Sequence, residues 1–175
     1  ICPYDALEFE PFATPKVIED KCVGCGACQL VCPHHAIQVK GFEFETVLKR
    51  YCEKAKQLKE SGKGPSILAF ICQWSEFSTL DNPQKAFEGK NVIALEVPCF
   101  KSLDPVHVVN ALSCGFDGVM AVMCSSKDCK LQEGRDTAER NLNVTLDVLK
   151  KNGLLERFEF YEESPRCEGE FQQKM

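Results

Sequence analysis

The sequence lacks any apolar run that approaches the roughly 18 residues required for a transmembrane helix. It also lacks a G-x-G-x-x-G segment after a predicted strand, a Walker sequence, and a cysteine–histidine pairing left over for nucleophilic catalysis. Lys and Arg residues are scattered along the chain and the net charge is -5, which opposes binding to nucleic acid. Any association with a membrane would therefore come through a partner.

Cysteine, in contrast, is abundant, with 12 residues in a chain of 175. No secretory signal accompanies these thiols, so an oxidising compartment is not indicated. In a reducing compartment, closely spaced cysteines are typical of metal binding. The composition therefore predicts a cytoplasmic, metal-binding protein, attached if at all to the inner face of a membrane through a partner subunit.

The segment from Cys22 to Pro33 contains the C-x2-C-x2-C-x3-C-P run with which bacterial ferredoxins hold [4Fe-4S] clusters. Gaps of two residues let one tight loop deliver three thiolates to the same cubane, and Gly24 and Gly26 let the backbone wrap closely around it. The last cysteine of such a run ligates the other cluster of a two-cluster ferredoxin. Cys22, Cys25 and Cys28 therefore need a fourth ligand from elsewhere, and Cys32 belongs to a different cluster.

Cys2 supplies the missing ligand. The stretch 1–7 has the same form as 31–37, with Cys-Pro followed by Ala three positions later. We therefore expect the sequence to begin inside a two-cluster ferredoxin domain, with Cys2 completing one cluster and the partners of Cys32 lying upstream. Zinc or disulfides are the alternatives, but zinc sites favour C-x2-C pairs separated by a longer loop, and three crowded thiols cannot all pair.

A different architecture follows. Short, continuous apolar runs over 66–72, 92–97 and 119–124, with a weaker one over 158–161, predict parallel strands covered on both faces. Apolar spacing and capping residues predict helices over 42–60, about 104–115 and about 133–152. The fold class is an α+β ferredoxin-like cluster domain followed by an α/β domain, a three-layer unit with a small parallel sheet flanked by helices. The expected boundaries are 1–41 for the ferredoxin domain, 42–64 for a helix and linker, 65–162 for the α/β domain and 163–175 for a polar tail.

Cysteines mark the ends of the predicted strands. Cys72 and Cys124 end the first and third strands, Cys99 follows the second, and Cys129 lies in the loop after Cys124. The carboxyl ends of parallel strands share one edge of the sheet, where open α/β folds build their sites. Four thiols at that edge suit a [2Fe-2S] cluster or zinc equally well by number, and the simpler alternative is that they are merely buried.

Other side chains near this edge have weaker indications. Lys127, Lys130 and Arg135 could ease the addition of negative charge to a cluster or form a positive docking rim, although solvated surface is the simpler interpretation. Trp74 could shield a cluster from water, or simply pack on the sheet. The cysteines expected to be non-ligating are Cys52, Cys114 and Cys167.

Several segments together resemble the MvhD (FlpD) family, the [2Fe-2S] delta subunit of methyl-viologen-reducing hydrogenase and its fusions. They are 65–74, 97–99, 116–124, 128–129, 133–134 and 138–140. The resemblance spans roughly 65–162 and implies a [2Fe-2S] cluster on Cys72, Cys99, Cys124 and Cys129. A ferredoxin domain followed by such a domain is also the order at the end of some HdrA-type flavoprotein subunits of heterodisulfide reductases and of QmoB, from a quinone-interacting membrane-bound oxidoreductase.

The sequence departs from the family pattern at one place. MvhD proteins usually carry Cys-Cys-Asn-Trp-Cys, whereas the corresponding segment from Ile71 to Ser75 retains only Cys72. Four candidate ligands remain, but the loss favours a QmoB-like or other bacterial HdrA-like subunit over one that docks a hydrogenase.

These observations predict an electron-transfer module of a multi-subunit oxidoreductase in anaerobic metabolism, relaying single electrons between [4Fe-4S] clusters and a [2Fe-2S] cluster and not catalytic by itself. The expected partners are a flavoprotein, a membrane quinone-reactive subunit, or a hydrogenase or dehydrogenase, with FAD bound by upstream residues. Two alternatives remain open. The chain could be the catalytic end that reduces a disulfide or heterodisulfide, or a zinc-bound interaction module without a redox role.

Overall fold

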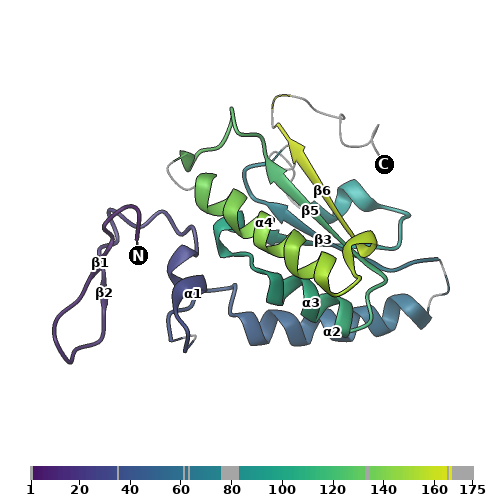
Figure 1. The fold of residues 1–175 in the computed structure, drawn as a ribbon, viewed down its shortest axis with the longest axis horizontal. Coiled ribbons are helices and arrows are strands. Elements are labelled where there is room, and N and C mark those ends of the chain that lie inside the picture. Colours follow the sequence, from purple (N-terminus) through teal and green to yellow (C-terminus); the bar gives the residue numbers. More distant parts are fainter. Residues whose placement is uncertain are drawn as a thin grey trace.

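A computed structural model describes residues 2–34, 36–60, 62, 64–75, 83–132, 135–164 and 166. An N-terminal segment (residues 2–34 and 36–41) precedes an α/β unit that begins at residue 44 (Figure 1). The elements, with η for short 3₁₀ helices, are β1 (Leu7–Glu8), β2 (Lys16–Val17), α1 (Ala27–Val31), α2 (Phe44–Glu60), β3 (Ile67–Cys72), η2 (Pro83–Phe87), β4 (Val92–Val97), η3 (Phe100–Ser102), α3 (Pro105–Ser113), β5 (Gly118–Cys124), α4 (Arg135–Lys151), η5 (Leu155–Arg157) and β6 (Phe158–Glu163).

The α/β unit is built on a four-stranded sheet with the order β4-β3-β5-β6. Every neighbouring pair in it is parallel. The central strand β3 is buried along nearly its whole length, as expected of an apolar strand covered on both faces. The weaker fourth strand predicted over 158–161 is present as β6. The predicted fold class is confirmed.

The two faces of the sheet are covered unequally. The main core packs α2, α3 and α4 against one face, which Figure 1 shows as a layer of helices in front of the strands. The opposite face packs against Phe87 of η2 in a smaller core with Ala69, Ile71 and Val122. The sequence predicts a three-layer unit, but in the described part of the chain the second layer of cover is this single short 3₁₀ helix. The cover is thin because all three long helices pack on the other face.

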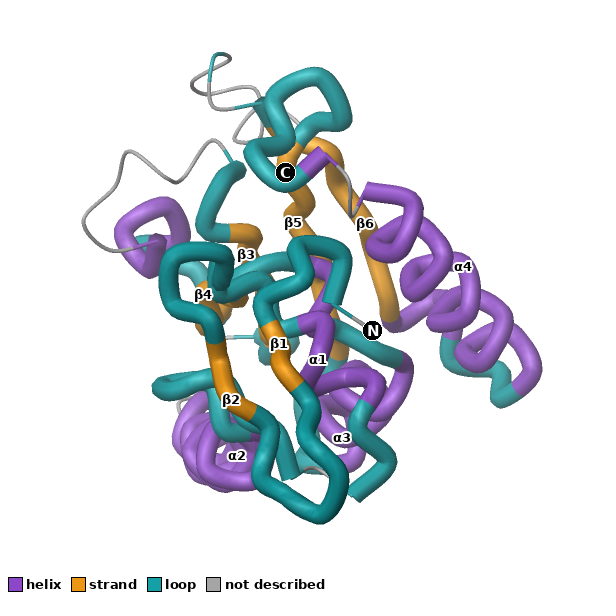
Figure 2. The backbone as a smooth tube through the Cα atoms, turned by 90° about the vertical axis from the view of Figure 1, so that its left-hand side faces the viewer, coloured by secondary structure: helices purple, strands orange, loops and turns teal. Residues whose placement is uncertain are grey.

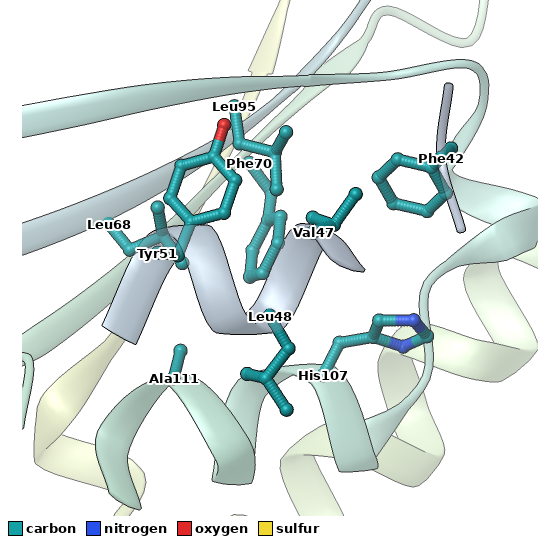
Figure 3. A pocket seen from close by; sticks show the side chains of 9 residues that line it. All are labelled: Phe42, Val47, Leu48, Tyr51, Leu68, Phe70, Leu95, His107 and Ala111. Atoms are coloured by element: carbon teal, nitrogen blue, oxygen red, sulfur yellow. The ribbon is translucent and has the colours of Figure 1, made fainter. Parts of the chain in front are cut away.

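Helix α2 is an integral part of the α/β core. Its Tyr51 packs beside Leu68 and Phe70 of β3, and its Leu48 points toward α3, as the side chains in Figure 3 show. The gap between these side chains has a volume of about 20 Å³, which is room for little more than one water molecule. This apolar joint is therefore packed core and not a ligand site. The helix of the predicted helix and linker over 42–64 packs in the α/β core.

The start of α3 is fixed by capping. Asp104 is the N-cap, Pro105 occupies the first turn, and the Asp104 and His107 side chains form a reciprocal capping box. The Val106 N–H donates to the Asp104 carboxylate at 2.8 Å. Because η3 immediately precedes this cap, the cap also holds the backbone that follows Cys99.

Cys52 and Cys114 form a disulfide that joins α2 to the end of α3. The sequence patterns indicate two separate non-ligating thiols. The correction is that they are partners, brought together across 62 residues because α2 and α3 lie side by side on the same face of the sheet. Both remain outside the two cysteine sets described below.

No helix in the described ranges is long and apolar enough to cross a membrane.

Candidate metal centres

The N-terminal segment encloses a cavity of about 240 Å³. The loop from Cys22 to Cys28 wraps one side of it, and the segment that begins at Cys2 closes the other. Figure 2 shows this segment, with β1, β2 and α1, in front of the sheet. The cysteines that line the cavity, here called the N-terminal cysteine set, are Cys2, Cys22, Cys25 and Cys28.

Two glycines shape that loop. Gly24 and Gly26 have φ angles of +66° and +76°, in the left-handed region that side chains other than glycine rarely adopt. The positive φ values turn the backbone around the cavity, and the thiols on either side of each glycine line it.

The two Cys-Pro segments have the same local geometry. The Ala6 N–H donates to Cys2 Sγ at 3.4 Å, and the Ala36 N–H donates to Cys32 Sγ at 3.3 Å. Amide donors of this kind stabilise negative charge on a ligating sulfur. Only Cys2 lines the cavity, whereas Cys32 is not among its lining residues. This arrangement supports the predicted division, in which Cys2 completes the N-terminal set and Cys32 serves another site.

Burial and crowding make one of the N-terminal thiols, that of Cys28, a poor anion on its own. Burial raises the pKa of the Cys28 thiol, and the neighbouring Cys25 and Cys22 raise it further. A bound metal reverses this balance, because a coordinating thiol is deprotonated outright. The set is therefore suited to a positively charged metal group.

The second group of cysteines lies at the carboxyl edge of the sheet. Cys72 and Cys124 are the last residues of β3 and β5, and Cys99 follows β4. The Cys124 thiol lies within hydrogen-bonding distance of the Cys72 and Cys129 thiols, and Cys99 interacts electrostatically with Cys124 and Cys129. All are buried. This sheet-edge cysteine set consists of Cys72, Cys99, Cys124 and Cys129, the residues predicted to converge there.

Burial makes three thiols of this set, those of Cys99, Cys124 and Cys129, costly to ionise without a cation. It raises the pKa of Cys99 to about 11 and also raises that of Cys129. The hydrogen bond with Cys72, together with burial, raises the pKa of Cys124. Backbone N–H groups act in the opposite sense, since Lys101 donates to Cys99 and Leu131 to Cys129. The loops thus offer donors to thiolate sulfur while solvent is excluded.

As the side chains stand, no group of three or more His, Cys, Asp or Glu among the described residues could hold a metal ion. Binding at either set therefore requires the thiols to reorient within their loops.

The charged and aromatic side chains near the sheet edge have more ordinary roles. Arg135 donates from Nη1 to the carbonyl oxygen of Cys124 at 2.7 Å and forms ion pairs with Glu139 and Glu162. It anchors the end of β5 and does not form a docking rim. Lys127 and Lys130 are exposed. Trp74 is 37% exposed and does not seal the site.

The two cysteine sets meet through their loops. A Cβ placed on Gly26 would lie 2.6 Å from the Cβ of Ser102, so the cysteine loop and η3 are in direct contact. Nearby, the Lys101 ammonium donates to the Tyr4 hydroxyl at 3.0 Å. Cys25 and the whole sheet-edge set belong to the same buried cluster. The N-terminal segment therefore docks on the edge of the sheet where the second set lies (Figure 1, Figure 2).

Lys101 is a residue of this junction that sequence reasoning missed. It is only 1% exposed, although a lysine two residues after a strand-end cysteine is usually solvated. Burial alone would lower its pKa, but the hydrogen bond to Tyr4 and the negative charges of Cys25 and Cys99 outweigh burial and raise it. No local sequence pattern marks this residue, because its burial results from the docking of the two segments.

Comparison with known proteins agrees with this architecture. Residues 67–175 match the family described as the methyl-viologen-reducing hydrogenase delta subunit (FlpD), and residues 15–38 match the 4Fe-4S binding domain. The chain belongs to the FlpD family and carries a 4Fe-4S binding domain before it. The predicted combination of a ferredoxin domain and an MvhD-type domain is confirmed.

The chain is also similar to a heterodisulfide reductase subunit and to a hydrogenase subunit. The chain is 30% identical to a subunit of the ferredoxin:CoB-CoM heterodisulfide reductase of Methanosarcina mazei, over 85% of this chain and 22% of that protein. It is 28% identical to an iron-sulfur subunit of the F420-non-reducing hydrogenase of Archaeoglobus profundus, over 51% of this chain and 67% of that protein. The chain thus spans about a fifth of the length of the heterodisulfide reductase subunit.

The contact between Gly26 and Ser102 leads to a prediction with a matched control. Gly24→Ala introduces only the strain of a positive φ, about 1–2 kcal/mol, because nothing lies within 4 Å of its added Cβ. Gly26→Ala adds the overlap with Ser102, and its free energy of unfolding is expected to fall by a further ~1–3 kcal/mol. Urea unfolding of the two variants measures the difference between their free energies of unfolding. Equal losses of unfolding free energy in the two variants would show that the cysteine loop and η3 are not in contact.

Proposed function

We propose that this chain is an electron-transfer module of a multi-subunit oxidoreductase. In this proposal the N-terminal cysteine set holds a [4Fe-4S] cluster and the sheet-edge set holds a [2Fe-2S] cluster. The observation that carries it is the presence of two separate sets of four cysteines, with Cys25 of the first set and all four cysteines of the second in one buried cluster of side chains. Cys32 is proposed to ligate a further [4Fe-4S] cluster.

When bound, such clusters supply one-electron redox chemistry with little structural rearrangement. The chain's own residues provide the rest. The N–H groups of Ala6, Lys101 and Leu131 donate to sulfur and stabilise its negative charge. Burial of the sheet-edge thiols excludes water from them.

Two observations indicate that the residues present suit iron-sulfur clusters. The N-terminal cavity is lined mainly by thiols and apolar side chains, with Gln38 and Lys40 also among its lining residues. No carboxylate of the described residues lines it, which favours soft metal ligation over a hard cation. Ser75, three positions after Cys72, is fully buried, and its hydroxyl has no hydrogen-bond partner among the described residues. A sulfur acceptor bound beside Cys72 could satisfy this hydroxyl.

The relatives suggest the kind of complex. One is an iron-sulfur subunit of a hydrogenase and the other a subunit of a heterodisulfide reductase. We propose that the chain works with a flavoprotein region or subunit carrying FAD and with a further redox partner, a hydrogenase, a dehydrogenase or a membrane quinone-reactive subunit. Ser75, which replaces a cysteine of the usual family segment, favours a QmoB-like or HdrA-like setting over docking to a hydrogenase.

Anaerobic purification with metal and sulfide analysis tests the proposal. We expect about 6 iron and 6 sulfide per chain, and two distinct paramagnetic signals after reduction with dithionite. Stoichiometric zinc without sulfide would establish the zinc-bound interaction module instead. Turnover of a disulfide or heterodisulfide by the isolated chain would identify it as the catalytic end of the complex.

A further inference from the structure

Lys101 is a buried cation, and no carboxylate of the described residues pairs with it. The residue is 1% exposed, and no Asp or Glu in the described part of the chain forms an ion pair with it. The ammonium donates to a neutral group, the Tyr4 hydroxyl at 3.0 Å, and lies 4.9 Å from the centre of the Tyr4 ring. A buried charge is strongly unfavourable unless an opposite charge compensates it. The fold therefore requires an anion near this position.

Lys101 lies between the two cysteine sets. It follows Cys99 of the sheet-edge set by two residues in η3, and its ammonium contacts Tyr4, which lines the N-terminal cavity together with Cys2 and Cys25. The backbone of Lys101 is held as well, because its N–H donates to Cys99 and its carbonyl accepts from Asn141 Nδ2 at 3.2 Å. The charge is thus fixed between the two sets and shielded from solvent.

We propose that Lys101 compensates the negative charge of both bound clusters and thereby raises their reduction potentials together. The inference rests on the proposed function. Reduction adds one negative charge to a group that is already anionic, and a fixed cation in a poorly screened position stabilises the reduced form more than the oxidised form. Because the side chain reaches Tyr4 from η3, it also links the two segments, and this second role requires a separate test.

The charge is tested with Lys101→Met, which keeps an unbranched side chain of similar length. Redox titration of the anaerobic full chain, followed by the two paramagnetic signals, should show the equilibrium constant for reduction falling at least tenfold at both clusters. This corresponds to ~59 mV or more for a one-electron couple. Lys130→Met is the matched control, since Lys130 is adjacent to Cys129 in sequence but exposed, and solvent screens its charge. Lys130→Met should change the equilibrium constant for reduction at either cluster by less than threefold.

Two further variants separate charge from shape and from tethering. Lys101→Arg keeps the charge, so the equilibrium constant for reduction at each cluster should stay within threefold of the wild-type value. Tyr4→Phe removes the hydroxyl contact but leaves the ammonium, so both equilibrium constants should again stay within threefold of the wild-type values. If Tyr4→Phe instead lowers both potentials as far as Lys101→Met does, Lys101 is a tether and the inference is overturned.

The remaining outcomes also decide whether the inference stands. Iron-loaded Lys101→Met with unchanged potentials overturns the inference while the proposed function stands. Loss of iron from Lys101→Met and Lys101→Gln, but not from Lys101→Arg, supports a required positive charge. Loss of iron from all three variants would show that the shape of the Lys101 side chain matters, and it would overturn the inference. A wild-type chain without iron overturns the proposed function itself.

Discussion

Cys25→Ser is expected to abolish the [4Fe-4S] signal and to remove about 4 iron atoms per chain. Cys25 is the most buried member of the N-terminal set and lies at the centre of its loop, directly before Gly26. A serine hydroxyl stays protonated where a thiolate is required, so the remaining three thiols cannot hold the cubane. Iron and sulfide analysis, with spectra of the reduced chain, measures the loss.

Cys32→Ser is the matched control for this experiment. Cys32 has the same amide-to-sulfur hydrogen bond as Cys2 but does not line the cavity. We expect the Cys32 variant to retain the [4Fe-4S] signal of this chain, whereas Cys2→Ser loses it. The reverse result would mean that Cys32 is the fourth ligand and that the division between two clusters is wrong.

The sheet-edge set was largely predictable from the sequence, because its placement depends on local patterns. Continuous apolar runs predict β3, β4 and β5, and parallel strands bring their carboxyl ends to one edge. The start of α3 was predictable for the same reason, since Asp104 and Pro105 form a local capping signal. Cys72, Cys99 and Cys124 lie together because each marks the end of a predicted strand, and Cys129 joins them from the loop that follows β5.

Features that depend on docking were not predictable. Lys101 has the sequence context of a surface residue, and only the seating of Tyr4 and Gly26 against η3 buries it. The pairing of Cys52 with Cys114 likewise depends on α2 crossing the sheet next to α3. Periodicity shows which face of each helix is apolar but not which face of the sheet it covers. The unequal cover of the two faces was therefore not predictable from the sequence.

The contact between the two segments bears on the proposed function more than either segment alone. A ferredoxin segment and an FlpD-type unit joined by a flexible linker would not need Gly26 against Ser102, nor Lys101 against Tyr4. These contacts join the loop that carries Cys25 to the buried cluster that contains the sheet-edge set, and they hold the two sets in a fixed relation. Electron transfer between fixed sites requires no search by diffusion, so this packing favours a relay within the chain over two independently acting modules.

Cys124→Ser is expected to remove the second cluster and to leave the first. Cys124 is 4% exposed, and its thiol contacts those of both Cys72 and Cys129, which places it at the centre of the sheet-edge set. We expect the loss of about 2 iron atoms per chain and of one of the two signals, with the [4Fe-4S] signal retained.

Cys114→Ser is the matched control for Cys124→Ser, because Cys114 lies at the end of α3 and pairs with Cys52 outside both sets. It should keep both signals and the full iron content. If Cys124→Ser also kept them, the sheet-edge thiols would be buried side chains and not ligands. If it lost both, the two centres would depend on each other for assembly, and Lys101, which interacts with a cysteine of each set, would be the first residue to examine.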